Sequence, residues 1–304
     1  MKKLFFLGCS LITFGLCMMY NDEIVNFLVD TFSILNKETS VLKNNIYASS
    51  REYQYVSLTD DFEPNSKQDI VNIYYTILNS GMSDFTFYCP NDYKECINDI
   101  NYISKNQLML SSINNFVPVY NSFENIETEF DSLGKVDIHI TYNYNINQIH
   151  EINAKLDEIF TEVIKDDMSL EDKIKAIHDY IINNTKYDTN RSDNKVVKYH
   201  SDSAYGALIE NYAICGGYAD SMKLFLDKLD IPNYKVSSEN HIWNLVYLNE
   251  NWYHLDLTWD DPVTSTGEDV LEYDYFLITN DELKELESDQ HGFDESIYKE
   301  AKSN

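Results

Sequence analysis

A cysteine followed by a helical pattern and then by two alternating segments constrains the fold of this chain more than any other feature. Cys215 stands where a helix should begin, and apolar residues then recur at helical spacing over Ala219–Leu229. The segments His241–Leu248 and Trp252–Leu257 alternate as strands, with a polar turn at Asn249–Asn251 between them. The order predicts an α+β fold in which the helix that begins at the cysteine packs on an antiparallel sheet.

The same stretch brings together three side chains that suit covalent chemistry. Cys215, His241 and Asp256 occur in the order of a nucleophile, a general base and an orienting acid. The unpaired amides and the dipole at a helix start favour a thiolate, and the Cys215 amide could stabilise an oxyanion. Gly216 and Gly217 are expected to leave room for a substrate backbone. The catalytic residues predicted are therefore Cys215, His241 and Asp256.

Each of these residues has a plainer interpretation when it is taken alone. A cysteine at a helix start is more often a small core residue, and a histidine at a strand edge is more often structural. His254 and Asp260 lie close enough in sequence to be mistaken for members of the triad. We expect His178 to be structural, while Trp243 and Trp259 belong either to the walls of the site or to the core. Only the ordered combination carries the prediction.

The sequence lacks the common ligand motifs for metals. The chain has no Cys-x-x-Cys pair, and Cys215 with His241 offers too few ligands for zinc. It also lacks the Asp-x-Asp-x-Asp-Gly pattern of a calcium loop. No metal or cofactor is therefore expected.

The charge balance narrows the choice of partners. Asp and Glu number 51 against 23 Lys and Arg, which gives a formal net charge of −28. A surface of this sign repels phosphate backbones, so nucleic acid is not an expected partner. It favours a cationic substrate such as a lysine-rich protein, or it only keeps the protein soluble. With 43% hydrophobic residues, the chain has ample material for a packed core.

The N-terminus predicts export. Lys2 and Lys3 precede an uncharged, largely apolar run from Leu4 to Tyr20, so residues 1–20 are expected to be a signal peptide or an N-terminal membrane anchor. The two alternatives stay open, because the run is also close to the shortest length that spans a bilayer. The expected location is extracytoplasmic, either secreted or attached to the membrane by this segment.

Export changes the meaning of the five cysteines. Cys9 and Cys17 fall in the leader, and Cys89 and Cys96 bracket a short loop that could close as a disulfide outside the cell. The alternative is that these two are small buried hydrophobic residues. Cys215 is then the odd thiol, and an unpaired thiol in an exported protein calls for a functional reason.

The rest of the chain divides into a lead-in, an accessory region and the segment that carries the triad. Residues 21–65 are expected to be a stalk or lead-in, residues 66–165 an α/β accessory region, and residues 166–304 the catalytic domain. In the accessory region, helical spacing marks 69–78, 96–109 and 149–163, and alternation marks strands at 84–89 and 136–144. The role of this region cannot be inferred from its residues.

The segment from Ser169 to Asp261 resembles the transglutaminase-like superfamily in its bacterial extracellular branch. The blocks that carry the resemblance are Lys173–Ile181, Ser203–Leu208, Ile214–Ala219, His241–Asn244 and Trp252–Pro262, with Tyr275–Thr279 and His291 as a tail. The resemblance implies a papain-like core with Cys215 as nucleophile, His241 as base and Asp256 as its partner. It also implies acyl chemistry, since the superfamily includes transglutaminases, thiol proteases and peptide:N-glycanases.

These observations predict an exported cysteine-dependent enzyme that processes amides through a thioester. It would act as a protein transglutaminase, a thiol protease or a deamidase on protein or cell-surface peptide substrates, cell-wall-associated ones among them. The alternative is a non-catalytic cell-surface binding module that retains the fold. The sequence makes no prediction of oligomeric state.

Overall fold

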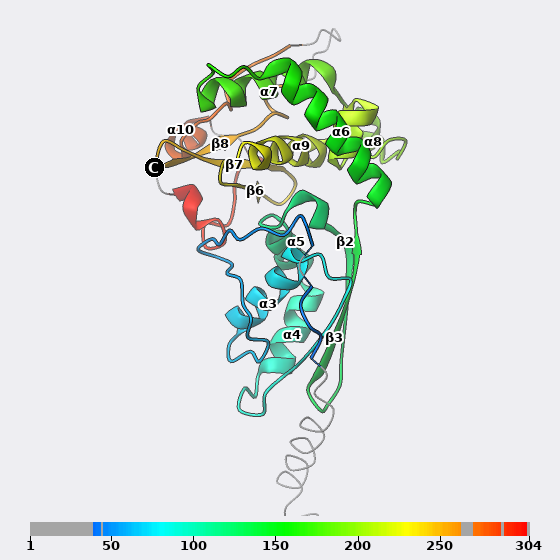
Figure 1. The fold of residues 1–304 in the computed structure, drawn as a ribbon. Helices are drawn as coiled ribbons and strands as arrows, with labels where there is room; N and C mark the ends of the chain where they lie inside the picture. The colour runs from blue at the N-terminus through cyan, green and yellow to red at the C-terminus, as the bar shows by residue number, and fades with distance from the viewer. Residues whose placement is uncertain (1–38, 44, 263–269, 287–288, 303–304) are drawn as a thin grey trace, which may run out of the picture.

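The computed structural model describes residues 39–43, 45–262, 270–286 and 289–302. The predicted leader, residues 1–20, lies outside them. Figure 1 shows a body built around α7 (Leu170–Asn184) and α9 (Cys215–Lys228). Beside it lies a second body, in which three helices within residues 67–114 lie next to a long hairpin formed by residues 123–142. Among the described residues, no helix is both long and apolar enough to cross a membrane.

The second body contains the first three-stranded sheet and three of the helices. Its strands are β1 (Asp84–Tyr88), β3 (Lys135–Tyr142) and β2 (Phe123–Phe130), and they are antiparallel in that order. The helices are α3 (Lys67–Asn79), α4 (Cys96–Lys105) and α5 (Gln107–Asn114). A short helical turn, η1 (Val119–Asn121), lies between α5 and β2, and another, η3 (Lys299–Lys302), lies at the C-terminal end of the described residues. The mixture of helix and sheet confirms the α+β class.

The single helix expected over 96–109 is two helices. Asn106 separates α4 from α5, since its backbone (φ −94°, ψ 87°) is not helical. Its side-chain oxygen accepts a hydrogen bond from the amide of Met109 at 3.1 Å and so begins the next helix. The periodicity of the apolar residues carries across this break, which is why spacing alone predicted one element.

The body with the cysteine helix contains the other sheet. Strands β6 (Asn233–Ser237), β7 (Ile242–Leu248) and β8 (Asn251–Leu255) are antiparallel in that order, which confirms the predicted hairpin. Helix α9 (Cys215–Lys228) packs against β6 and β7. The remaining elements are α6 (Ile146–Val163), α7 (Leu170–Asn184), β4 (Lys186–Tyr187), α8 (Thr189–Asn194), η2 (Gly206–Glu210), β5 (Tyr212–Ala213) and α10 (Asn280–Glu285).

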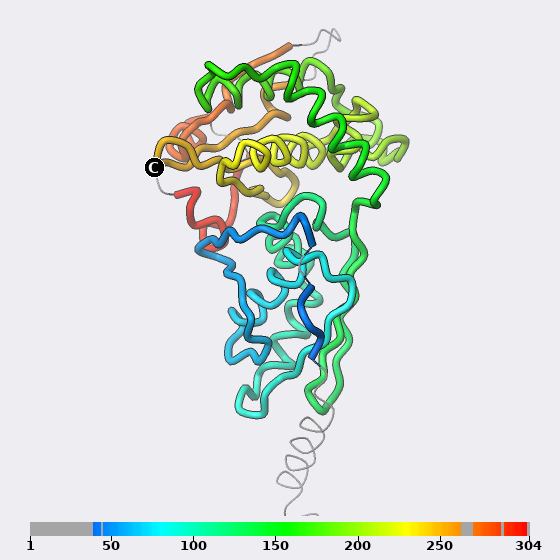
Figure 2. The backbone as a smooth tube through the Cα atoms, in the orientation of Figure 1, coloured from blue at the N-terminus to red at the C-terminus, as the bar shows by residue number. Residues whose placement is uncertain are grey.

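The described part of the predicted lead-in packs into the protein rather than standing clear of it. Val56 is buried, and the ring of Tyr53 lies 5.4 Å from that of Phe116 and 5.0 Å from that of Tyr234. Figure 2 shows the C-terminal segment descending to this lead-in, where Glu300 accepts a hydrogen bond from the Gln54 amide at 2.7 Å. The C-terminal segment therefore lies beside residues 51–56 of the lead-in.

A single hydrophobic cluster joins the accessory region to the β6–β8 sheet. It contains Phe116 from the accessory region, Tyr234 and Trp243 from the sheet, and Tyr298 from the C-terminal segment. Helix α6, which the sequence analysis places in residues 66–165, packs instead with α7 in a second cluster around α9. The accessory region and the β6–β8 sheet thus share one hydrophobic interior.

We expect a cavity in the shared cluster to destabilise both regions together. Phe116→Ala should lower the free energy of unfolding by about 3–5 kcal/mol, because this buried ring of the accessory region packs against Tyr234 of β6 and Tyr298 of the C-terminal segment. All three tryptophans lie between positions 243 and 259, so their fluorescence in a urea titration reports on the sheet, although the substitution is in the accessory region. A tryptophan transition that stays unmoved would contradict the shared core, and Leu108→Ala at an exposed position is the matched control.

Candidate active site

Cys215 begins α9, as predicted. The residue before it, Ile214, is extended (φ −107°, ψ −179°), and no side chain caps the helix. The Ile214 carbonyl accepts hydrogen bonds from the amides of Gly217 at 2.9 Å and Tyr218 at 3.3 Å. Cys215 is a free cysteine and a half-buried residue, and its place at the first turn puts its side chain near the positive end of the helix dipole.

The two glycines after the cysteine allow the start of α9 to pack closely against neighbouring backbone. A Cβ atom at Gly217 would lie 2.5 Å from the Ser201 carbonyl oxygen, and one at Gly216 would lie 2.8 Å from that of Asp202. The start of α9 is therefore pressed against the protein's own backbone, which also accepts a 2.7 Å hydrogen bond from the Ile214 amide at Ser201. Packing thus accounts for both glycines, and their predicted role in leaving room for a substrate backbone stays a prediction.

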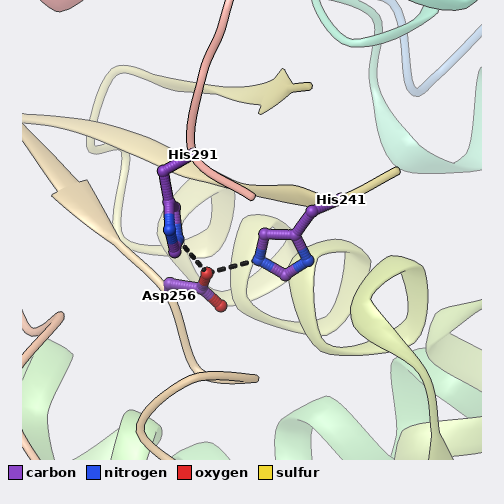
Figure 3. A group of neighbouring side chains, drawn as sticks. All are labelled: His241, Asp256 and His291. Carbon is purple, nitrogen blue, oxygen red and sulfur yellow. Dashed lines mark hydrogen bonds and ion pairs between the residues drawn. The ribbon is translucent and has the colours of Figure 1, made fainter. Parts of the chain in front are cut away.

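His241 immediately precedes β7 and is almost fully buried. Its amide donates to the Ser238 hydroxyl at 3.2 Å, and its carbonyl accepts from the Ser238 amide at 2.9 Å, which holds the backbone in a tight loop. The ring stacks on Trp243 with centroids 5.6 Å apart. Its Nε2 atom lies 2.5 Å from Oδ2 of Asp256, while the other ring nitrogen points away from the carboxylate (Figure 3).

Asp256, directly after β8, is buried and surrounded by donors. Oδ2 accepts from the rings of His241 at 2.5 Å and His291 at 2.8 Å. Oδ1 accepts from the amides of Thr258 at 2.9 Å and Trp259 at 3.3 Å. Figure 3 shows the two imidazoles converging on one oxygen from different segments. A carboxylate offers about four lone-pair sites, so these four donors occupy all the acceptor sites of Asp256.

The charges of this group favour an ion pair. Burial lowers the pKa of His241, but the adjacent Asp256 charge and hydrogen bond, together with the Cys215 thiol, raise it to about 10. Burial opposes ionisation of Asp256, yet the charge and hydrogen bonds of His241, with those of His291, hold the pKa of this carboxyl well below its usual range. At neutral pH His241 therefore carries a proton, which suits it to stabilise a thiolate and to protonate a leaving amine.

The other nearby histidines and acids have partners elsewhere. The Trp243 indole donates to Nδ1 of His254 at 2.9 Å, and burial, with the charge of His291, lowers the pKa of His254 to about 3. Asp260 pairs with the buried His178 at 3.1 Å and accepts from the Tyr275 amide. Neither His254 nor Asp260 competes for a place in the triad, and His178 is structural as expected.

His291 is the one member of this cluster to which the sequence analysis gave no role. It lies 35 residues after Asp256 in the C-terminal segment. The segment that carries it has no regular secondary structure at that point, so no periodicity places it beside the triad. The one sequence signal for His291 is its place in the tail of the family resemblance, and the contact with Asp256 itself depends on the tertiary fold.

The His241, Asp256 and His291 ligand atoms lie within 4.8 Å of one another, which is also compatible with a metal centre. Their individual spacings favour hydrogen bonds instead. Ligands of a tetrahedral zinc with bonds of about 2.0–2.1 Å stand about 3.3 Å apart, whereas Asp256 Oδ2 lies 2.5 and 2.8 Å from the two ring nitrogens. A metal would require all three side chains to move apart in a buried site.

Comparison with known proteins agrees with the resemblance. The family model of the transglutaminase-like superfamily matches residues 157–257, less than half of the chain. One similar solved structure is a TGase (TM-score 0.34, 16% identity, 45% of this chain and 44% of the other). Another is a candidate cysteine protease from Cytophaga hutchinsonii (TM-score 0.28, 16% identity, 48% and 65%). The chain thus spans less than two thirds of either structure. No curated protein matches significantly.

Removing the carboxylate should change how stability depends on pH. The pKa of His241 is raised in the folded protein, so its contribution is fully present below about pH 6.5, the value for a free histidine, and is lost as the pH rises through about 10. In Asp256→Asn the pKa of His241 should fall, and the free energy of unfolding should decline less between these limits. Urea titrations from pH 6 to pH 10 measure this.

The matched control is Asp167→Asn at an exposed position between α6 and α7, which should keep the wild-type slope. If the slopes for Asp256→Asn and wild type were equal, the ion pair would not be the source of the raised His241 pKa.

Proposed function

We propose that this chain, whose residues 157–257 match the transglutaminase-like superfamily, is an exported cysteine-dependent enzyme that processes amides. Cys215 is the nucleophile, His241 its acid–base partner and Asp256 the orienting acid. The observation that carries the proposal is the 2.5 Å contact between His241 and Asp256, beside a free thiol at the start of α9.

The reaction follows from the charges of the three groups. The Cys215 thiolate attacks the carbonyl carbon of an amide, a C–S bond forms, and the oxygen takes the negative charge. The Cys215 N–H belongs to the first turn of α9, where amides have no partner within the helix, and it would stabilise that oxyanion. His241 then gives its proton to the departing nitrogen as the C–N bond breaks, which leaves a thioester and a neutral imidazole.

The thioester is resolved by the reverse proton movement. Water or an amine attacks the acyl carbon, His241 takes up the proton, and the thiolate leaves. Water gives hydrolysis, as in a protease or deamidase, and a lysine amine gives a cross-link. The net charge of −28 favours attraction of lysine-bearing protein or cell-surface peptide substrates, cell-wall-associated ones included. Nucleic acid is not proposed as a partner, for the same reason.

Export is supported by cysteine chemistry as well as by the N-terminal pattern. Cys89 and Cys96 form a disulfide, which confirms one of the two alternatives for this pair, and Cys215 is the free cysteine among the described residues. Disulfides persist in oxidising compartments outside the cytosol. Residues 1–20 are proposed to direct export, either as a cleaved signal or as a retained anchor.

Loss of the thiol should abolish the reaction. Cys215→Ala should remove all turnover, measured as incorporation of fluorescent cadaverine into casein and, by mass spectrometry, as deamidation or cleavage of the same casein. Asp256→Asn should lower kcat by about 100-fold or more, because the His241 ring loses its orienting charge. Asp167→Asn should match wild type.

The products distinguish the forms of the proposal. A gain of cadaverine shows transamidation, a gain of one mass unit at glutamine shows deamidation, and new termini show proteolysis. Turnover retained in Cys215→Ala would overturn the assignment. Casein binding without any covalent product in the wild type would favour the non-catalytic binding module instead.

A further inference from the structure

The carboxylate at the centre of the proposed site carries more donors than a nucleophile–base–acid set needs. The hydrogen bond to Asp256 Oδ2 would by itself orient His241. The amides of Thr258 and Trp259 already hold Oδ1, the other oxygen of the carboxylate. His291 adds a fourth donor, 2.8 Å from the oxygen that also contacts His241. Because the ionised carboxylate only accepts hydrogen bonds, both rings must present an Nε2–H to it.

The surroundings of His291 fix its ring in this orientation. The side chain is 2% exposed and stacks on Tyr275, with centroids 4.8 Å apart and planes at 17°. The rings of Trp243 and Trp259 meet it edge to face at 4.9 and 5.1 Å. A ring held on three sides loses little further conformational entropy when it donates its hydrogen bond.

The segment that carries His291 is anchored to both parts of the protein. The Tyr298 hydroxyl accepts from the Asn115 amide group at 2.7 Å and contacts the Ser237 hydroxyl at 2.8 Å. Glu300 accepts from the Tyr234 hydroxyl at 3.0 Å and from the Gln54 amide. The accessory region and β6 thus hold the segment from which the fourth donor comes.

We infer that His291 is a positioning residue of the proposed active site. Its Nε2–H locks the Asp256 carboxylate, so that the imidazole of His241 presents its other nitrogen toward Cys215. Without this donor, one lone pair of a buried carboxylate loses its partner, and the group can rotate away from the orientation that His241 requires. This inference rests on the proposed function for its catalytic consequence, although not for the geometry itself.

Two substitutions separate the hydrogen bond from the packing. His291→Phe keeps an aromatic ring among Tyr275, Trp243 and Trp259 but removes the donor, whereas His291→Gln places an amide N–H near the position of Nε2. We expect His291→Phe to slow alkylation of Cys215 by iodoacetamide at pH 7 at least about tenfold, the scale of a lost hydrogen bond to a charged group. His291→Gln should stay within about threefold of wild type.

The same variants should show a loss of kcat with little change in KM if casein is turned over. Alkylation needs no substrate, so it tests the inference even if the proposed reaction fails. The control is the same pair of changes at His150, an exposed residue of α6, and these should leave both rates unchanged. Thermal unfolding establishes whether each variant is folded.

Three outcomes would overturn the role of His291. One is wild-type alkylation in a folded His291→Phe variant. Another is an equal loss in the Phe and Gln variants, which would indicate packing alone. The third applies even where the Phe variant does not fold: nitrogen-15 NMR of the wild-type histidines that finds the His291 proton on Nδ1 and not on Nε2. A protonated Nε2, with the rates given above, supports it.

Discussion

The buried carboxylate of Asp256 is the group on which the geometry of the site depends. A charge with 2% of its side chain exposed is stable only where hydrogen bonds and an opposite charge replace its lost hydration. Four donors do so here, and they come from the start of β7, from the turn after β8 and from the C-terminal segment. Segments far apart in the sequence must therefore converge before this residue can be both buried and ionised.

That requirement explains why the two bodies share an interior. The C-terminal segment that reaches Asp256 is held in part by Tyr298, which lies between Asn115 of the accessory region and Ser237 of β6. The Phe116 ring packs beside Tyr298 as well, with ring centroids 4.7 Å from Tyr234 and 5.9 Å from Tyr298. The accessory region, for which the sequence suggested no role, thereby helps to hold the segment that carries His291, without contributing a residue to the proposed site.

The sequence predicted the elements that depend on local pattern and missed those that depend on tertiary packing. The hairpin and the helix that begins at Cys215 follow from periodicity and turn chemistry, which act between near neighbours. Strand β2 was missed because its side chains are mostly exposed and show little alternation. The roles of Gly216 and Gly217 depend on residues 201–203, and that contact exists only in the folded chain.

Burial increases from Cys215 to His241 and then to Asp256, and this order bears on the proposed reaction. Cys215 is half-buried, His241 is 6% exposed, and Asp256 is 2% exposed. In the proposed reaction, Cys215 is thus the member of the three that a substrate from solvent would reach most readily. Because the first turn of α9 is pressed against the backbone of residues 201–203, the sulfur stands on a rigid element, and the imidazole is fixed by a carboxylate with no spare lone pair. If the proposed reaction holds, these groups are already fixed before a substrate arrives, and such positioning lowers a reaction barrier.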